Sequence, residues 1–215
     1  MPRSSLTPAE VKAMLMTVAD RIIVNEPLLS EADRNLGDGD HGLGMQRGMT
    51  EAKNNLALLP DDTPFGKQFG GVGMAMMSSM GGASGVIFGT LFRDGGKALA
   101  GLESFDSAAL AVFLKAACEG VMNRGKAKPG DKTMVDALYP AADKAAEVAN
   151  QPLPDALAAV AAAAHAGVHA TRDMVATIGR AKSLGQGSVG HPDAGALSVA
   201  VILEAMRDYV AATEE

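Results

Sequence analysis

The sequence predicts an all-α fold, and three observations support that prediction. Apolar residues recur at helical spacing in eight stretches of the chain. No stretch shows the sustained alternation of apolar and polar residues that a half-buried strand requires. Alanine-rich segments such as 161–164 favour helix because alanine loses no side-chain entropy there. The 215 residues are 47% hydrophobic and carry no linker or repeat, so we expect a single domain over 1–215.

The first helix is predicted to begin after Thr7. Thr7 is a capping residue, Pro8 occupies the first helical position, and Glu10 follows three residues after the cap. An apolar stripe at helical spacing then marks the face that turns towards the core: Val11, Met14, Leu15, Val18, Ile22 and Ile23.

Further helices are expected near 43–56, 66–80, 86–100, 105–123, 134–149, 154–177 and 194–213. Four glycine-rich segments lie between the helices: 36–44, 81–85, 125–133 and 179–195. Loops in helical bundles usually run to about 2–8 residues, so two of these segments are longer than packing requires. The extra backbone at these positions indicates a ligand site.

Composition and charge exclude several classes of protein. With 19 Lys and Arg against 25 Asp and Glu, the net charge is −6 and no basic run is present, so nucleic acid is not an expected partner. The uncharged stretch 68–92 is interrupted by many glycines and serines, and we expect no membrane span. The N-terminus lacks the pattern of a signal peptide, and the lone Cys118, read as a small buried hydrophobe, excludes an intramolecular disulfide. A cytoplasmic protein is expected.

The segment 33–42, Asp-Arg-Asn-Leu-Gly-Asp-Gly-Asp-His-Gly, carries the strongest chemical signal. Asp33, Asp38 and Asp40 would repel one another unless a cation lies among them, and oxygen ligands suit magnesium or calcium. An EF-hand is excluded because Gly42 and Met49 fall where the calcium loop needs an oxygen ligand and a glutamate. A solvated Asp/Gly turn remains the alternative. Magnesium usually completes its shell with substrate phosphates, so a nucleotide is the expected companion.

The segment 81–85, Gly-Gly-Ala-Ser-Gly, is the best candidate for a phosphate cradle. Its glycines permit close backbone approach, the next helix offers N–H groups, and Ser84 offers a hydroxyl. A close helix–helix contact explains the small residues equally well. The segment 120–127 resembles a Walker A loop, but Ala127 lacks the hydroxyl that magnesium needs and no strand precedes it. A P-loop NTPase is therefore excluded.

The segment 179–195 combines cations with glycines, as a phosphate contact would require. Arg180 and Lys182 suit phosphate binding, although both also read as ordinary surface charges, and Asp193 suits the N-cap of the last helix. His165 and His169 lie one helical turn apart without the glutamate of a metalloprotease helix. We interpret both histidines as packing or surface residues.

Four of these strings, in this order, resemble the nucleotide-binding L subunit of dihydroxyacetone kinases. They are 37–42 (Gly-Asp-Gly-Asp-His-Gly), 81–85, 124–134 (Arg-Gly-Lys-Ala-Lys-Pro-Gly-Asp-Lys-Thr-Met) and 179–195. The resemblance covers nearly the whole chain. It implies a barrel of about eight antiparallel helices with the nucleotide held by loops at one end.

The resemblance also implies roles for particular residues. Asp33, Asp38 and Asp40 would hold two magnesium ions that bridge the phosphates of ADP or ATP. Arg180 would stabilise charge on the transferred phosphoryl group, as a catalytic residue. Ser84 would contact phosphate and Met134 would lie near the base. The residues lining the nucleotide would be His41, Leu43, Gly44, Ala83, Ser84, Gly125, Met134, Arg180, Asp193 and Gly195.

The family binds its ketose through a histidine of a separate K subunit or domain, so a sugar-binding partner is expected. In one version of the system, resident ADP is rephosphorylated by a phosphodonor protein of the phosphotransferase system, and a stand-alone chain favours that version. In the other version the domain is fused to its substrate domain and uses free ATP. The segment 182–187 departs from the family pattern, which leaves an erythrulose kinase component open. A non-catalytic nucleotide-binding regulatory module and a homodimer are also left open.

Overall fold

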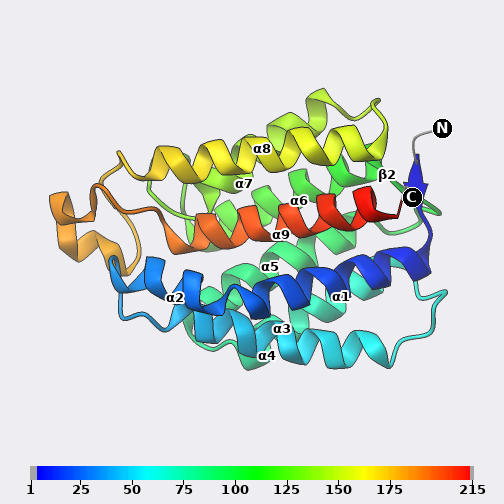
Figure 1. Ribbon diagram of the computed structural model, residues 1–215, viewed down its shortest axis with the longest axis horizontal. Helices are drawn as coiled ribbons and strands as arrows, with labels where there is room; N and C mark the ends of the chain where they lie inside the picture. The colour runs from blue at the N-terminus through cyan, green and yellow to red at the C-terminus, as the bar shows by residue number, and fades with distance from the viewer. Residues whose placement is uncertain (1–3, 214–215) are drawn as a thin grey trace.

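The computed structural model describes residues 4–213, which fold almost entirely into helices (Figure 1). Within that range the elements are β1 (Ser5–Leu6), α1 (Pro8–Val24), α2 (Glu26–Arg34), α3 (His41–Ala57), α4 (Phe65–Ser79), α5 (Gly82–Ala98), β2 (Phe105–Asp106), α6 (Ser107–Gly125), α7 (Val135–Glu147), α8 (Leu153–Thr171), the 3₁₀ segment η1 (Arg180–Ser188) and α9 (Ala194–Ala212). The predicted all-α fold is confirmed. The two short strands pair with each other, antiparallel, and pin the start of α1 beside α6.

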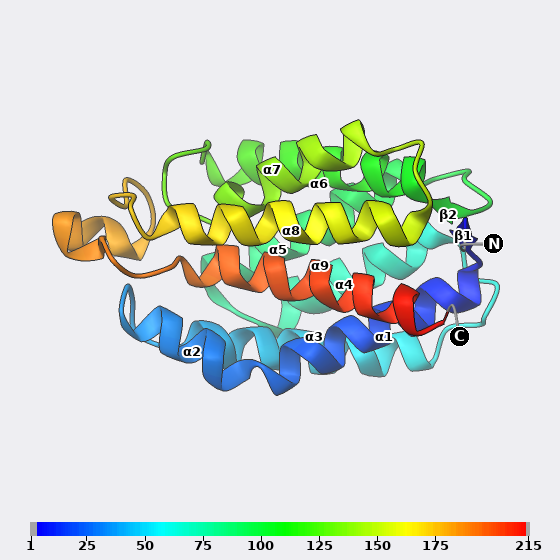
Figure 2. The same ribbon diagram turned by 45° about the horizontal axis from the view of Figure 1, so that its top comes forward.

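The long helices form a closed ring. Each packs against the next in the order α1, α3, α4, α5, α6, α7, α8, α9, and α9 packs back against α1. Among the described residues this ring contains eight helices, and the short α2 lies outside the sequence of neighbours, against α3 and α9. Neighbouring helices run in opposite directions (Figures 1 and 2). The expected antiparallel barrel is therefore present.

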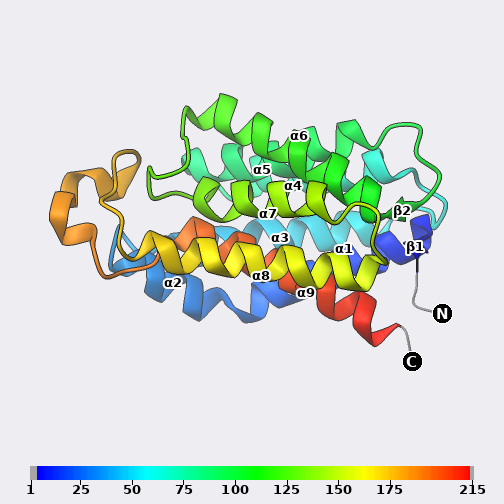
Figure 3. The ribbon, with the colours of Figure 1, turned by 90° about the horizontal axis from the view of Figure 1, so that it is seen from above.

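The alternation of helix direction decides where the loops lie. The connections 35–40, 80–81, 126–134 and 172–193 all lie at one end of the barrel, on the left in Figures 1 and 3. The β1–β2 pair and the connections 58–64 and 148–152 lie at the other end. The four glycine-rich segments are thus brought to the same end although up to about 150 residues separate them in the chain.

Capping residues fix several helix starts. The Thr7 side chain accepts a hydrogen bond from the Glu10 N–H, and the Glu10 carboxylate accepts one from the Thr7 N–H at 2.7 Å, which completes the predicted capping box. Asp193 caps α9 as predicted, accepting from the Ala196 N–H at 2.8 Å. These local signals are reliable because each cap satisfies backbone donors that the helix leaves free.

The short helix α2 was not predicted. Pro27 at its start cannot continue α1, because its ring would collide with the carbonyl of Ile23 and it lacks an N–H to donate. The chain therefore breaks at Asn25, whose side chain donates to the Arg21 carbonyl at 2.8 Å. The nine residues of α2 bury Leu29 and little else that is large and apolar, so their periodic signal is weak.

The helix predicted over 154–177 ends earlier, at Thr171. The carbonyls that a longer helix would use are taken by other partners. The Thr171 carbonyl accepts from Lys132 Nζ at 2.7 Å, and the Arg172 carbonyl accepts from the Gly190 N–H at 2.7 Å. Residues 172–177 consequently form part of a long loop at the site end of the barrel.

The uncharged stretch 68–92 is explained by close packing of α4 against α5. A Cβ atom at Gly89 would lie 2.7 Å from the Gly73 carbonyl oxygen, and one at Gly66 would lie 2.9 Å from that of Gly96. The two backbones approach this closely only because glycine occupies these positions. Between Ser4 and Thr213 no helix has the length and apolar character needed to cross a membrane.

Aromatic side chains fill the interior towards the end of the barrel opposite the glycine-rich loops. Phe69 lies with its ring centroid 4.5 Å from that of Phe113 and 5.8 Å from that of Phe105. Cys118 is buried on α6 with its thiol 3.8 Å from the Met122 sulfur, and burial raises the pKa of that thiol to about 11. Cys118 is therefore an inert buried side chain, as expected.

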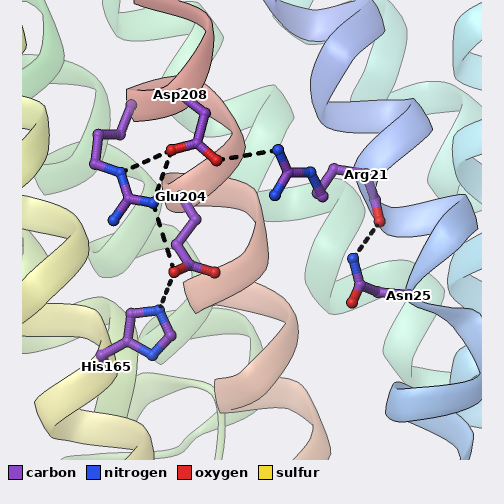
Figure 4. Close-up of polar contacts among 6 residues, drawn as sticks. Arg21, Asn25, His165, Glu204 and Asp208 are labelled. Atoms are coloured by element: carbon purple, nitrogen blue, oxygen red, sulfur yellow. Dashed lines mark hydrogen bonds and ion pairs between the residues drawn. The ribbon is translucent and has the colours of Figure 1, made fainter. Parts of the chain in front are cut away.

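A polar network lies where the ring closes between the first and last helices (Figure 4). Arg21 on α1 pairs with Asp208 on α9 at 3.0 Å, and His165 on α8 lies 2.8 Å from Glu204 on α9. Arg207 bridges Asp208 and Glu204. These side chains are partly exposed, so the ion pairs contribute little to the free energy of unfolding, although they join the three helices. His165 belongs to this network and His169 is exposed, in line with the prediction for both.

The α4–α5 contact predicts opposite effects for two glycine-to-alanine changes. Gly89→Ala should lower the free energy of unfolding by about 2 kcal/mol, because its methyl group would press on the α4 backbone. Gly71→Ala, on α4, meets nothing within 4 Å and should raise the free energy of unfolding by about 0.5–1 kcal/mol. Urea unfolding monitored by circular dichroism measures both, and equal effects would contradict the close backbone contact.

Candidate functional site

Three carboxylates gather where α2 ends and α3 begins. Ligand oxygens of Asp33, Asp38 and Asp40 all lie within 4.8 Å of one another. In the described part of the chain this is the one group of acidic, histidine or cysteine side chains with the spacing of a metal site. Asp33 also lies in the last turn of α2, where the helix dipole disfavours a negative charge. The cluster therefore carries an excess of negative charge.

The backbone turn that forms the cluster is held by its own hydrogen bonds. The Asp33 carbonyl accepts from the Gly37 N–H at 2.6 Å, and the Asp33 carboxylate accepts from the His41 N–H at 3.2 Å. Gly39 has φ +77°, a conformation that favours glycine. The turn brings the carboxylates of Asp38 and Asp40 close to that of Asp33.

Arg180 reaches the same cluster from the opposite part of the sequence. Its guanidinium forms an ion pair with Asp38, and it lies 3.8 Å from the carboxylate of Asp40. A cavity of about 320 Å³ lies beside this pair, and its lining includes Arg34, Gly37, Asp38, Arg180 and Ser183. The predicted catalytic and metal-ligating residues are thus in contact, although about 140 positions separate them in the chain.

The donor set fits a hard divalent cation. All the converging ligand atoms are carboxylate oxygens, which magnesium and calcium prefer. The side chains of Asp38 and Asp40 are 51% and 67% exposed, so further ligands can approach from the cavity side. Arg180 supplies one positive charge among three negative ones, which leaves room for additional cations at the cluster.

The ring of His41 faces the interior of the barrel, away from the carboxylates. Its Nε2 lies 2.8 Å from the Ser198 hydroxyl, and its ring centroid lies 5.7 Å from that of Phe88. Burial lowers the pKa of His41, while the nearby Asp33 carboxylate raises it. The contact between the His41 ring and Ser198 joins α3 to α9, and the backbone N–H of His41 faces the cluster.

The predicted phosphate cradle forms the exposed first turn of α5. Gly81 and Gly82 have φ of +79° and +62°, and Ala83 and Ser84 are exposed. Backbone N–H groups in the first turn of a helix have no partners within the helix, so they can bind an anion here. Leu43 is exposed on the neighbouring α3.

Two contacts bring α3 against this turn. A Cβ at Gly44 would lie 3.2 Å from Met80 Cγ, so glycine permits the close approach. Arg47 donates to the Met80 carbonyl at 3.1 Å, at the end of α4. Arg47 therefore places a cation beside the cradle. The sequence analysis missed it because one arginine on a predicted helix face reads as surface charge.

The remaining predicted residues lie where α6, α7 and α9 meet the site end. Gly125 is the last residue of α6, and Met134 precedes α7. A Cβ at Gly195 would lie 3.2 Å from the Cβ of Met134, so the starts of α7 and α9 touch. Asp193 lies beside Gly195 and caps α9. The structure places these residues on neighbouring loops; their contact with a nucleotide remains a prediction.

Lys132 is a prominent residue at this end that the sequence analysis did not single out. It is 1% exposed, and its Nζ donates to the carbonyls of Thr171, Ser188 and His191 at 2.6–2.7 Å and of Met174 at 3.2 Å. No local pattern indicates such a role, because the acceptors are backbone atoms about 40–60 positions away. A buried lysine is recognisable only once the loops are placed.

The chain is similar to several known proteins over most of its length. The family model described as the DAK2 domain matches residues 35–208. The ADP-binding subunit of a PEP-dependent dihydroxyacetone kinase from Escherichia coli (strain K12) is 36% identical over 202 residues, covering 93% of this chain and 96% of that subunit. The L-erythrulose kinase of Pectobacterium atrosepticum is 37% identical over 200 residues, 91% of this chain and 34% of that enzyme.

A solved structure is similar over the same extent. The dihydroxyacetone kinase from C. freundii, in complex with AMP-PNP and Mg²⁺, matches with a TM-score of 0.72 and 27% identity. The match covers 97% of this chain and 35% of that one. This chain therefore spans about a third of the length of that kinase, as it does of the L-erythrulose kinase.

The environment of Asp193 predicts a pH effect on stability. Burial raises the pKa of Asp193 to about 7, although the Ala196 N–H and Lys132 oppose the shift. The folded chain thus keeps a proton that the unfolded chain releases near pH 4, and the resulting stabilisation is lost as pH rises from about 4 through about 7. The amide introduced by Asp193→Asn would still cap α9 but could not titrate.

Between about pH 5 and pH 8 the stability of the wild type relative to Asp193→Asn should therefore fall by about 2 kcal/mol. Urea unfolding of both proteins in chelator, without nucleotide, measures this difference. A difference that stays constant with pH would show that Asp193 titrates like an ordinary carboxyl group.

Proposed function

This chain belongs to the DAK2 domain family, and on that basis we propose that it is the nucleotide-binding subunit of a kinase for a small ketose such as dihydroxyacetone. The observation that carries the proposal is the meeting of three carboxylates and Arg180 at the end of the barrel where the glycine-rich loops converge. Phosphoryl transfer depends mainly on positioning and on electrostatic stabilisation, and these groups suit both tasks.

Asp33, Asp38 and Asp40 would hold magnesium, and we propose two ions. The fit rests on the all-oxygen donor set and on the excess negative charge that Arg180 alone does not balance. When bound, the magnesium nucleotide supplies the phosphoryl group and neutralises charge on its oxygens. Related chains support the assignment: one is named an ADP-binding subunit, and a similar kinase was solved with AMP-PNP and Mg²⁺.

The other residues of the site are proposed to bind and orient the nucleotide. The first turn of α5 offers backbone N–H groups and the Ser84 hydroxyl to phosphate oxygens. Arg180 stabilises negative charge on the transferred group, which requires it to exchange its carboxylate partners for phosphate. Met134 offers an apolar surface to the base. The remaining lining residues are proposed to be His41, through its backbone, and Leu43, Gly44, Ala83, Gly125, Asp193 and Gly195.

The acceptor sugar and the phosphoryl donor are proposed to come from partner proteins. We propose that the ketose is held by a separate K subunit, and that resident ADP is rephosphorylated by a phosphotransferase-system protein. The support is that relatives from Escherichia coli and Lactococcus lactis are named subunits of PEP-dependent and PTS-dependent kinases. In this scheme the chain is one nucleotide-binding domain that carries the phosphoryl group between two partners.

A second candidate is an ATP-dependent kinase component for a tetrose such as erythrulose. The L-erythrulose kinase relative is 37% identical, which is as similar as the dihydroxyacetone kinase subunits. The two candidates use the same carboxylates and differ in nucleotide exchange. ATP-driven turnover requires ADP to leave after each cycle, whereas the first candidate retains it.

Removal of one carboxylate tests the proposed function. Asp38→Asn should weaken the magnesium-dependent binding of ADP by at least about 100-fold, because a ligand and a negative charge are lost. Helix content should not change, since Asp38 is exposed and lies outside the helices. Isothermal titration calorimetry with and without magnesium, together with far-ultraviolet circular dichroism, measures both effects.

Asp62→Asn is the matched control for this test. It removes the same charge from an exposed loop at the other end of the barrel, and it should bind nucleotide as the wild type does. Unchanged affinity in Asp38→Asn would remove the carboxylate cluster from the proposed site.

A further inference from the structure

We propose that Lys132 is the positioning residue of this site, whose ammonium group ties down the loop 172–193 and so holds Arg180 beside the carboxylate cluster. The role given to Arg180 rests on the proposed function, whereas the tie itself does not. Lys132 lies in the loop between α6 and α7, and Arg180 lies in η1, the outermost segment at that end of the barrel (Figure 1).

The acceptors of Lys132 lie on both sides of η1. Before η1, Nζ donates to the carbonyls of Thr171 at 2.7 Å and Met174 at 3.2 Å. After most of η1, it donates to those of Ser188 at 2.6 Å and His191 at 2.7 Å. One ammonium group therefore joins the two ends of the loop that carries Arg180.

The segment that carries Arg180 has little apolar packing to hold it, although the Gly190 N–H donates to the Arg172 carbonyl at 2.7 Å and the Ala176 N–H donates to the Ser188 hydroxyl at 3.0 Å. Of the described residues 180–188, Ser188 alone is buried, so apolar packing contributes little to its position. The Arg180 side chain is 62% exposed, and an exposed ion pair with Asp38 does not hold a loop by itself. The position of η1 therefore depends on polar contacts at its two ends, and the largest group of these is formed by the three N–H groups of Lys132, which share four carbonyl acceptors.

The cage around Nζ requires a cation. Four carbonyl oxygens converge on Nζ, and the buried carbonyl of Ser188 would lose its Lys132 donor if the ammonium group were removed. Burial lowers the pKa of Lys132, and the nearby Asp193 carboxylate opposes that shift. Carbonyl oxygens arranged in this way are also suitable ligands for a small monovalent cation.

The backbone of Lys132 is itself fixed in an unfavourable conformation. Its φ is +61°, which a residue with a Cβ rarely adopts. Flanking contacts hold it there: the Asp131 carboxylate accepts from the Thr177 hydroxyl at 2.6 Å, and the Asp136 carboxylate accepts from the Thr133 N–H at 2.7 Å. Such strain persists only where the surroundings determine the geometry, as they do at functional sites.

Lys132→Gly tests the proposal without adding backbone strain, because glycine tolerates the positive φ. Lys126→Gly is the matched control: Lys126 has φ +56°, lies in the same loop and is exposed. Amide hydrogen exchange of the nucleotide-free proteins, read by mass spectrometry, should be at least about tenfold faster across 172–193 in Lys132→Gly than in the control. The affinity for magnesium ADP should fall by about tenfold or more.

Chemical rescue separates the ammonium group from the rest of the side chain. Ammonium chloride should slow exchange across 172–193 in Lys132→Gly and restore part of the affinity, because the ion fits the carbonyl cage. Tetramethylammonium chloride at the same ionic strength is too large to do so. Neither salt should change the exchange of Lys126→Gly.

Several results would overturn the proposal. Equal exchange across 172–193 in the two variants would exclude the tie. Faster exchange with unchanged affinity for magnesium ADP would exclude a positioning role. Global unfolding of Lys132→Gly that ammonium does not reverse would exclude a role confined to this loop. If the wild type fails to bind magnesium ADP, the proposed function fails, while the exchange comparison still decides whether Lys132 ties the loop.

Discussion

Three carboxylates crowd together at one end of the barrel, and the loops at that end are arranged around them. Asp33, Asp38 and Asp40 lie close enough to repel one another, and Asp33 adds its charge to the negative end of a helix. Two features reduce this repulsion. Arg180, on the loop 172–193, pairs with the cluster, and backbone N–H groups of the turn donate hydrogen bonds to the carboxylates. This excess of negative charge favours the binding of cations, which in turn can bind an anion such as phosphate.

The order and direction of the helices around the barrel determine where the loops lie, and packing in the interior determines how the helices are spaced. Because successive helices run antiparallel around a closed ring, every second connection falls at the same end, which assembles one site from four distant segments. Glycine contacts set the spacing of α4 and α5, and so they fix the start of α5 where the cradle lies. The aromatic cluster lies towards the other end, away from the proposed nucleotide site.

Much of this arrangement could be predicted from the sequence, because its signals are local. The capping box at Thr7, the cap at Asp193 and the spacing of the carboxylates each depend on a few adjacent residues. The end of α8 at Thr171 and the role of Lys132 could not be predicted, because both depend on contacts between segments far apart in the chain. The inward direction of the His41 ring was hidden for the same reason.

Extraction of a bound nucleotide is the decisive experiment on the proposal that this end of the barrel holds a magnesium nucleotide. The protein is purified in magnesium, dialysed extensively and denatured, and the released nucleotide is identified by chromatography, with and without prior treatment with chelator. We expect about one equivalent of ADP per chain, which leaves during dialysis only after chelation. A protein that carries no nucleotide, and that binds neither ADP nor ATP when magnesium is supplied, would contradict the proposal.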